Sequence, residues 1–335
     1  MSENGRLVEE SIVALAEQSL NRGWPGVVKG VGDDAAVVEG QAGKWLMAAD
    51  LLMEGVHFRR SWMGPADLAR KVLSINLSDL AAMGGRGSHA LLSLALPGDV
   101  DQDWVEAFFE ALAESASRFG VAVIGGDTTG SPGPIMAHLS LWGPANPSGV
   151  IYRSGAKEGD RLFVSRLLGG AAAGLAGLEQ GLELPEELRL ALCNPFPEVE
   201  LGYFLGESGS VSAMIDLSDG LAVDTARLAR ASGLAAVIEA EKIPLAGAAE
   251  EMGRRLKIEP LLLGLEGGED YALLMTCPSE KANEFRSSVR SQLERTIFEI
   301  GWVEKGEGAF LVQKGERRPL DSTGFNHFSL GSGKT

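Results

Sequence analysis

The stretch that decides the fold is VGDDAAVVEGQAGKWLMAADLLMEGVHF, residues Val31–Phe58. It predicts a buried apolar strand over Lys44–Ala49 that ends in a carboxylate at Asp50. Two more carboxylates, Asp33 and Asp34, precede this strand. A strand that ends in Asp presents charged oxygens at a sheet edge, where ligands of α/β proteins usually bind. The stretch therefore predicts a binding site.

The same construction recurs twice along the chain. The apolar run Val121–Ile124 leads into Gly125-Gly126-Asp127, and Val211–Ile215 leads into Asp216-Leu217-Ser218-Asp219. Several carboxylates on one edge repel each other unless cations neutralise them. Mg²⁺ is usually held by a few carboxylates together with substrate phosphates. The set predicts a site for several Mg²⁺ ions and a phosphate, although one Asp alone is more typical of a turn or a helix cap.

Composition bounds the class of protein. The chain has 335 residues, which suggests two domains, and 45% of them are hydrophobic. Its formal net charge of −16 argues against nucleic acid as a partner and means that a phosphate substrate needs cations to mediate its contact. With only Cys193 and Cys277, no signal-peptide pattern and no apolar run of membrane-spanning length, we expect a cytoplasmic protein without a membrane partner.

The order of the expected elements indicates an α+β fold. A long helix over Pro65–Met83 carries Asp79 in an apolar setting, which favours a role in a site. The consecutive strands Val121–Ile124 and Ile135–Trp142 predict antiparallel pairing and not a doubly wound sheet. The Gly- and Pro-containing segment Gly143–Ser148 is the best linker candidate.

That linker divides the chain into an N-terminal domain, residues 1–147, and a C-terminal domain, residues 148–335. In the second domain Ser218 or Asp219 is expected to cap a helix over Leu221–Ala231. Arg153 stands among glycines, and the sequence leaves open whether it binds phosphate or lies in a solvated turn.

Phosphate-binding loops of the common kinds are missing from the sequence. The final residues, Gly331–Thr335, imitate the end of a P-loop, but Phe328 stands where its first glycine belongs. Any nucleotide must therefore be held in another way. His57, directly after the acidic strand, is interpreted as a substrate contact, with a general base or a structural loop histidine as alternatives.

Taken together, these motifs resemble the thiamine-monophosphate kinase family, in the superfamily of aminoimidazole-ribonucleotide synthetase and selenophosphate synthetase. The matching segments span nearly the whole chain in the family's order; they are Gly32–Ala36, Asp50–Phe58, Asn76–Gly84, Gly125–Thr129, Arg153–Gly159, Ile215–Leu221 and Gly267–Tyr271. The resemblance implies ATP- and Mg²⁺-dependent phosphorylation of thiamine monophosphate to thiamine diphosphate by direct in-line transfer. It also implies a homodimer joined through the N-terminal domains.

Residue roles follow from the resemblance position by position. The implied Mg²⁺ ligands are Asp34, Asp50, Asp79, Asp127, Asp216 and Asp219. Among them, Asp50 and Asp127 are expected to matter most for catalysis. The implied ATP contacts are Gly126, Asp127, Arg153 and Ser218, and the implied thiamine monophosphate contacts are His57, Glu269 and Phe325.

The chain departs from the family pattern at Ala48-Ala49, where the family usually has a hydroxyl residue before the aspartate, and at Ala272, where it often has Glu. The rival superfamily enzymes fit less well, because there is no cysteine before Cys193 and none at the C-terminus. An alternative from another class is a nucleotide-binding protein without catalytic activity. Ala48-Ala49 is the only feature of the sequence that favours this alternative.

Overall fold

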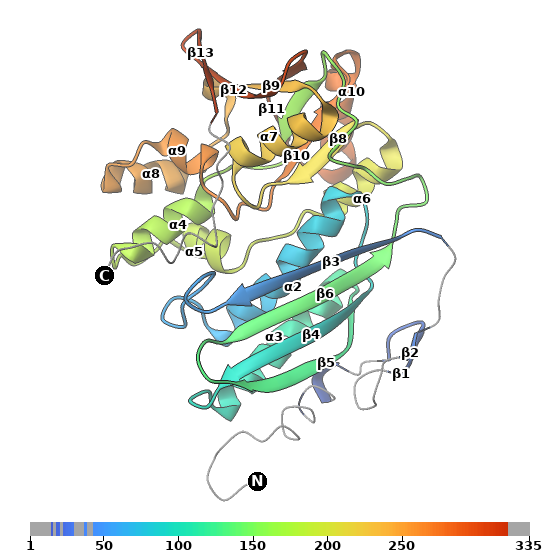
Figure 1. Cartoon of the computed structure of the whole chain (residues 1–335), viewed down its shortest axis with the longest axis vertical. Coiled ribbons are helices and arrows are strands. Elements are labelled where there is room, and N and C mark those ends of the chain that lie inside the picture. Colours follow the sequence, from blue (N-terminus) through green and yellow to red (C-terminus); the bar gives the residue numbers. More distant parts are fainter. Residues whose placement is uncertain (1–14, 16–17, 21–22, 30–36, 39–42, 321–335) are drawn as a thin grey trace, which may run out of the picture. The chain divides into compact units, whose positions relative to one another are not determined.

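The chain divides into two compact units, residues 1–80 with 85–145 and residues 81–84 with 146–335. The structure is a computed structural model that describes residues 15, 18–20, 23–29, 37–38 and 43–320 (Figure 1). Across these described residues, no helix combines the length and the apolar composition that a membrane crossing requires.

The first unit is built on a four-stranded sheet in the order β3-β6-β4-β5. β6 runs antiparallel to both of its neighbours, whereas β4 and β5 are parallel. The strands of this sheet are β3 (Trp45–Met53), β4 (His89–Pro97), β5 (Ala122–Ser131) and β6 (Met136–Pro144). The unit also contains the strand pair β1 (Val27–Lys29) and β2 (Val37–Val38), and the helices α2 (Pro65–Ala82) and α3 (Gln102–Phe119).

The expected antiparallel pairing of Val121–Ile124 with Ile135–Trp142 is wrong. β5 pairs with β4, and β6 is inserted between β3 and β4. The reason lies in the connection between β4 and β5, which contains the 18-residue helix α3. A helical crossover returns the chain parallel to the first strand, and β5 therefore joins β4 as a parallel edge strand.

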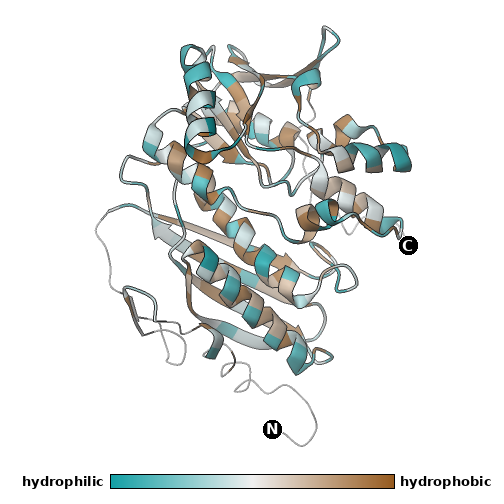
Figure 2. Cartoon of the chain, turned by 180° about the vertical axis from the view of Figure 1, so that it is seen from behind, coloured by the Kyte–Doolittle hydropathy of each residue, from teal (hydrophilic) through white to brown (hydrophobic). Residues whose placement is uncertain are grey.

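One face of this sheet is covered and the other is open. Leu92, Leu94, Leu139 and Leu141 alternate along β4 and β6 and are buried. Their face lies against α2 and α3, as the two opposite views in Figures 1 and 2 agree. The open face carries the most exposed large apolar residues of the unit, which are Met47 at 77%, Leu51 at 41% and Leu91 at 38%.

The second unit is built on a seven-stranded sheet in the order β13-β12-β9-β11-β7-β10-β8, in which only β12 and β9 pair in parallel. Its strands are β7 (Arg161–Val164), β8 (Ala213–Asp216), β9 (Ala235–Glu239), β10 (Leu273–Cys277), β11 (Phe298–Glu304), β12 (Gly308–Gln313) and β13 (Glu316–Pro319). Its helices are α4 (Gly170–Glu179), α5 (Glu186–Cys193), α6 (Val199–Ser208), α7 (Leu221–Ser232), α8 (Gly247–Leu256), α9 (Pro260–Leu265) and α10 (Ala282–Leu293), with 3₁₀ turns η1 (Ala240–Lys242) and η2 (Ser279–Lys281).

Alternation along the strands of this second sheet gives it two apolar faces. Leu162 and Val164 pack in one cluster with Leu228 of α7. Phe163 packs in the other with Phe285 of α10, ring centroids 5.2 Å apart and edge to face. A further cluster joins α4, α5, α8 and α9 beside the sheet (Figure 1). The α+β class expected from the sequence is thus confirmed, with mixed sheets in both units.

Candidate active site

The sequence-predicted site residues fall into three groups. Asp34 and Phe325, and also Asp33, lie outside the described residues. The first unit holds Asp50, His57, Asp79, Gly126 and Asp127. The second unit holds Arg153, Asp216, Ser218, Asp219 and Glu269.

Asp50 lies inside a strand, and the prediction that the strand ends there is wrong. β3 continues to Met53, and Asp50 is paired with Leu139 of β6. Leu139 is in turn paired with Leu92 of β4, and both leucines are buried. Opposed residues point to the same face of a sheet. The Asp50 carboxylate therefore lies on the covered face, among apolar neighbours, where a charge is expensive.

The carboxylates of Asp50 and Asp79 share a hydrogen bond, which joins the sheet to helix α2. Burial raises the pKa of Asp50, while that hydrogen bond and the nearby His138 and His57 oppose the rise. Two carboxylates form a hydrogen bond only when one of them holds a proton. The pair is thus a position where a positive charge, a proton or a cation, is required between two oxygens.

Helix α2 places two further buried polar groups before Asp79, Asn76 one turn away and Lys71 about two turns away. Asn76 donates from Nδ2 to the carbonyl oxygen of Val72 at 2.9 Å. Its Oδ1 is buried and accepts no hydrogen bond from the part of the chain that the structure describes. Lys71 is fully buried on the same helix. An unsatisfied buried oxygen is costly, and a ligand or cation would relieve it.

Asp127 also lies inside a strand, because β5 runs on to Ser131. It pairs with Ser93, which pairs with His138, and these side chains lie on the open face. Three strand spacings separate β3 from β5, roughly 14 Å. The structure therefore does not bring Asp127 beside Asp50, and within this unit the two carboxylates cannot share one ion.

Gly126 is required by the packing of β5 on β4. A Cβ at this position would lie 1.6 Å from the carbonyl oxygen of Leu92, and the residue has a φ of 156°. Any side chain would push the two parallel strands apart. The exposed backbone next to Asp127 therefore stays accessible to a ligand, as the expected ATP contact requires.

His57 lies in the turn that follows β3. The backbone N–H of Met53 donates to its Nδ1 at 3.0 Å, so that the neutral ring carries its proton on Nε2. The turn is fastened by Glu54, whose carboxylate accepts from the N–H of Ile135 at 3.1 Å and from Nε of Arg60 at 2.7 Å. The imidazole is thus held in one orientation on a fixed loop.

In the second unit, two predicted motifs are joined directly. The N–H of Glu269 donates to the carbonyl oxygen of Ser218 at 2.8 Å, and the N–H of Tyr271 to that of Leu217 at 2.9 Å. Asp216 ends β8, as predicted, and is buried. Glu269 and Tyr271 have φ values of 67° and 46°, which are strained for residues other than glycine. The two motifs form one rigid structure.

The predicted helix cap at Ser218 or Asp219 is wrong, because Gly220 is the N-cap of α7 and no side chain caps it. Instead Asp219 is held from within the helix. Asp224 accepts from the N–H of Asp219 at 3.0 Å, and Arg227 forms ion pairs with both carboxylates. Burial raises the pKa of Asp224 to about 7. Two side chains of α7, Asp224 in its first turn and Arg227 one turn later, therefore hold the loop at Asp219.

Asp270 is a residue that sequence reasoning missed. Its carboxylate accepts from the N–H of Gly169 at 2.9 and 3.1 Å, at the start of α4. Burial raises its pKa to about 7, against the hydrogen bonds from the backbone of Gly169, Gly170 and Ala171. The only signal in the sequence was its place next to Glu269, because its partners lie 101 residues away.

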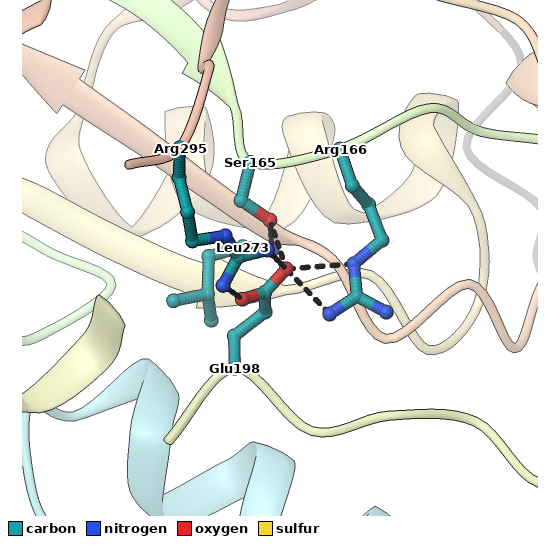
Figure 3. Close-up of polar contacts among 5 residues, drawn as sticks. All are labelled: Ser165, Arg166, Glu198, Leu273 and Arg295. Carbon is teal, nitrogen blue, oxygen red and sulfur yellow. Dashed lines mark hydrogen bonds and ion pairs between the residues drawn. The ribbon is translucent and has the colours of Figure 1, made fainter. Parts of the chain in front are cut away.

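A second missed group is Glu198, whose side chain is fully buried. Figure 3 shows its carboxylate between the guanidinium groups of Arg166 and Arg295. It accepts from Nε of Arg166 and Nη2 of Arg295, each at 2.7 Å, and from Oγ of Ser165 at 3.2 Å. Ser165 in turn accepts from the N–H of Leu273 at 2.8 Å. The network fixes Arg166 beside the strands.

Arg153 lies on an exposed loop, and its carbonyl oxygen accepts from Ser232 at 3.4 Å. Over the described ranges, no three side chains of His, Cys, Asp or Glu are grouped as ligands of a single ion. The carboxylates come instead as the Asp50–Asp79 pair in the first unit and, in the second, as Asp219 and Asp224 bridged by the guanidinium of Arg227.

Two family models and several named proteins are similar to this chain over most of its length. The family model "AIR synthase related protein, N-terminal domain" matches residues 32–143, and "AIR synthase related protein, C-terminal domain" matches residues 157–314. The thiamine-monophosphate kinase of Aquifex aeolicus (strain VF5) is 35% identical over 302 residues, covering 90% of this chain and 93% of the relative. That of Salmonella typhimurium is 36% identical over 329 residues, covering 96% and 98%.

Solved structures give the same result. The structure described as AaThiL complexed with AMPPCP and TMP is 32% identical, covers 98% of this chain and 100% of its own, and superposes with a TM-score of 0.75. The hydrogenase maturation protein HypE in complex with ATP superposes with a TM-score of 0.78 at 18% identity, which shows a shared fold alone.

Proposed function

The chain belongs to the thiamine-monophosphate kinase family, and from this membership we propose how its own side chains carry out the reaction. It is an ATP-dependent phosphotransferase that converts thiamine monophosphate to thiamine diphosphate. An oxygen of the acceptor phosphate attacks the γ-phosphorus of ATP in line, the bond to the β–γ bridging oxygen breaks, and ADP leaves. The attacking oxygen is already anionic, so no side chain has to act as a strong base.

We assign Mg²⁺ to the carboxylates, and the observation that carries this assignment is the hydrogen bond between Asp50 and Asp79. The pair already requires one positive charge between its oxygens, and oxygen-only donors suit Mg²⁺. When bound, Mg²⁺ neutralises the charge that spreads over the phosphate oxygens. Asp127 belongs to a separate ion position, since it lies across the sheet from Asp50. Asp34, Asp216 and Asp219 complete the proposed ligand set.

We assign the remaining residues by their positions. The open backbone at Gly126, the exposed guanidinium of Arg153 and the loop residue Ser218 contact ATP. The orientation of His57 supports a contact with the acceptor phosphate through its Nε2–H. Glu269 and Phe325 bind the thiamine monophosphate as well. Residues 1–147 supply the first set of metal ligands, and residues 148–335 complete the nucleotide and substrate site.

We further propose a homodimer formed through the open face of the N-terminal sheet. Three large apolar side chains are exposed there, Met47 and Leu51 on β3 and Leu91 on β4, with β6 between the two strands. An apolar sheet face without a covering layer is typical of a protein–protein interface. The cytoplasm is the proposed location, in keeping with two buried cysteines that remain thiols.

A thermal-denaturation experiment tests the metal assignment without turnover. Mg²⁺ that binds only the folded protein raises the melting temperature. Asp50→Asn and Asp79→Asn are expected to lose most of that rise, whereas Asp103→Asn, an exposed carboxylate in the first turn of α3, keeps it. An equal Mg²⁺-dependent rise in all three variants and the wild type would remove Asp50 and Asp79 from the metal site.

A further inference from the structure

Arg227 on α7 joins two carboxylates that belong to one short stretch of the second unit. Its Nη1 pairs with Oδ2 of Asp219 and, at 2.8 Å, with Oδ1 of Asp224. The other oxygen of Asp224, Oδ2, accepts from the backbone N–H of Asp219 at 3.0 Å. Asp224 is completely buried, and it holds the guanidinium and the backbone of Asp219 at the same time. The three residues therefore form a closed ring of contacts.

The backbone of the loop before α7 is held independently of Arg227. A Cβ on Gly268 would lie 2.6 Å from the carbonyl oxygen of Ser218, and the N–H of Glu269 donates to that same oxygen at 2.8 Å. This close packing of two backbone segments fixes the position of the neighbouring Asp219. What Arg227 adds is the direction of the Asp219 side chain, which is 29% exposed and would otherwise adopt several rotamers.

The Asp219 carboxylate fits a divalent cation in this setting. Arg227 takes up Oδ2, and a carboxylate has a second oxygen, Oδ1, with which it can bind another partner. Burial raises the pKa of Asp224, and the charges of Asp216 and Asp219 add to the rise, so the three carboxylates interact electrostatically. One guanidinium cannot neutralise all three. The remaining negative charge suits a hard divalent cation with oxygen ligands.

We propose that Arg227 is a positioning residue for the metal ligand Asp219: it holds Oδ2 and thereby leaves Oδ1 as the oxygen that takes the cation. Asp224 holds the guanidinium in turn. The proposal rests on the assignment of Mg²⁺ to Asp219 in the proposed function and adds the residues that support this ligand. Loss of a partner that orients a metal ligand typically lowers the metal affinity about 10- to 100-fold. If Arg227 merely occupied the place of the cation, its removal would instead raise the metal affinity.

Titration with Mn²⁺, followed by electron paramagnetic resonance of the free ion, tests the proposal without turnover. Mn²⁺ shares the preference of Mg²⁺ for oxygen ligands. Arg227→Ala is expected to weaken the binding of Mn²⁺ at one site about tenfold or more. Removal of a positive charge by itself favours a nearby cation, so the change of charge cannot explain a weaker affinity. Arg230→Ala is the matched control, because it removes an exposed arginine from the last turn of the same helix, and it should not weaken the binding.

Melting temperatures show whether the variants fold. If Arg227→Ala is destabilised because Asp224 is left buried without its guanidinium, Arg227→Gln replaces it in the experiment. Glutamine retains most of the aliphatic stem and one donor group, but it cannot bridge the two carboxylates with a charge. It is expected to weaken the binding of Mn²⁺ in the same direction by a smaller factor. Wild-type or tighter binding in Arg227→Gln would overturn the proposal.

A double-mutant cycle tests whether Arg227 acts through Asp219. In the Asp219→Asn background, Arg227→Ala should change the Mn²⁺ affinity less than about twofold, since the positioned ligand is already lost. Wild-type or tighter affinity in Arg227→Ala, beside weakened binding in Asp219→Asn, overturns the positioning role alone. An equal loss from Arg227→Ala in both backgrounds also overturns it. Wild-type affinity in Asp219→Asn would instead contradict the assignment of Mg²⁺ to Asp219 in the proposed function, and this inference with it.

Discussion

His57 has its Nδ1 engaged by the backbone, which directs the opposite side of the ring to the substrate role proposed for it. A single hydrogen bond to a charged group contributes about 1.5 kcal/mol, which corresponds to about tenfold in binding. His57→Ala is therefore expected to raise the KM for thiamine monophosphate about tenfold, with a much smaller change in kcat. His89→Ala serves as the control, because His89 stacks on Trp142 elsewhere in the unit. An unchanged KM in His57→Ala would exclude this residue from the substrate pocket.

The raised pKa of Asp270 leads to a prediction about how the stability of the protein depends on pH. Burial raises its pKa from 3.8 to about 7, so the folded protein holds a proton that the unfolded chain has released between these values. This contribution to stability is present at low pH and is lost as the pH rises toward 7. In urea denaturation from about pH 5 to about pH 8, Asp270→Asn should gain stability relative to the wild type as the pH rises. A difference independent of pH would contradict the assignment.

Single residues also show where prediction from sequence stopped. Asp50, Asp79, Asp127 and Asp216 stand out because charged residues interrupt apolar runs. Asp270 and Glu198 do not stand out, because their roles depend on distant hydrogen-bond partners. Asp270 is bonded to a residue 101 positions away, and Glu198 to one 97 positions away. Contacts of that kind depend on the tertiary fold, and no local spacing in the sequence predicts them.

Among the elements, the strands that lead to Asp50 and Asp127 were predicted too short. The apolar runs do stop at these residues, but backbone pairing continues along β3 and β5. A strand is maintained by backbone hydrogen bonds, which do not depend on the side chain. A carboxylate or a glycine can therefore stand inside a strand where the sheet face is open or where a partner accepts the charge. The helices predicted over Pro65–Met83 and Leu221–Ala231 match α2 and α7 within one residue, because the apolar period and the glycine that follows each helix are local signals.

The carboxylate of Glu198, at the start of α6, binds residues next to β7 and β11. This role leads to a prediction about stability. Glu198→Ala leaves the guanidinium groups of Arg166 and Arg295 partly buried without their carboxylate. We expect the free energy of unfolding to fall by about 3 kcal/mol. Glu186→Ala removes a comparable but exposed pair with Arg189 and should change it little. Equal effects of the two substitutions in urea denaturation would contradict the view that Glu198 organises this region.

At the level of the whole molecule, the open sheet face predicts the oligomeric state. Met47, on the edge strand β3, is 77% exposed on this face, and Met47→Glu would place a charge in the proposed dimer interface. We expect sedimentation equilibrium to show a dimer for the wild type and a monomer for Met47→Glu. Leu262→Glu, which alters an exposed leucine of the second unit, should remain dimeric. A monomeric wild type would contradict the proposed interface.

The central claim is that this acidic chain uses divalent cations to transfer a phosphoryl group to thiamine monophosphate. Phosphorus NMR of the purified protein with ATP, Mg²⁺ and thiamine monophosphate tests it most directly. We predict the appearance of thiamine diphosphate and ADP, their loss on addition of EDTA, and their return when Mg²⁺ is restored in excess. Product formation that continues in EDTA would contradict the metal assignment, and ATP binding without any product would contradict the kinase itself.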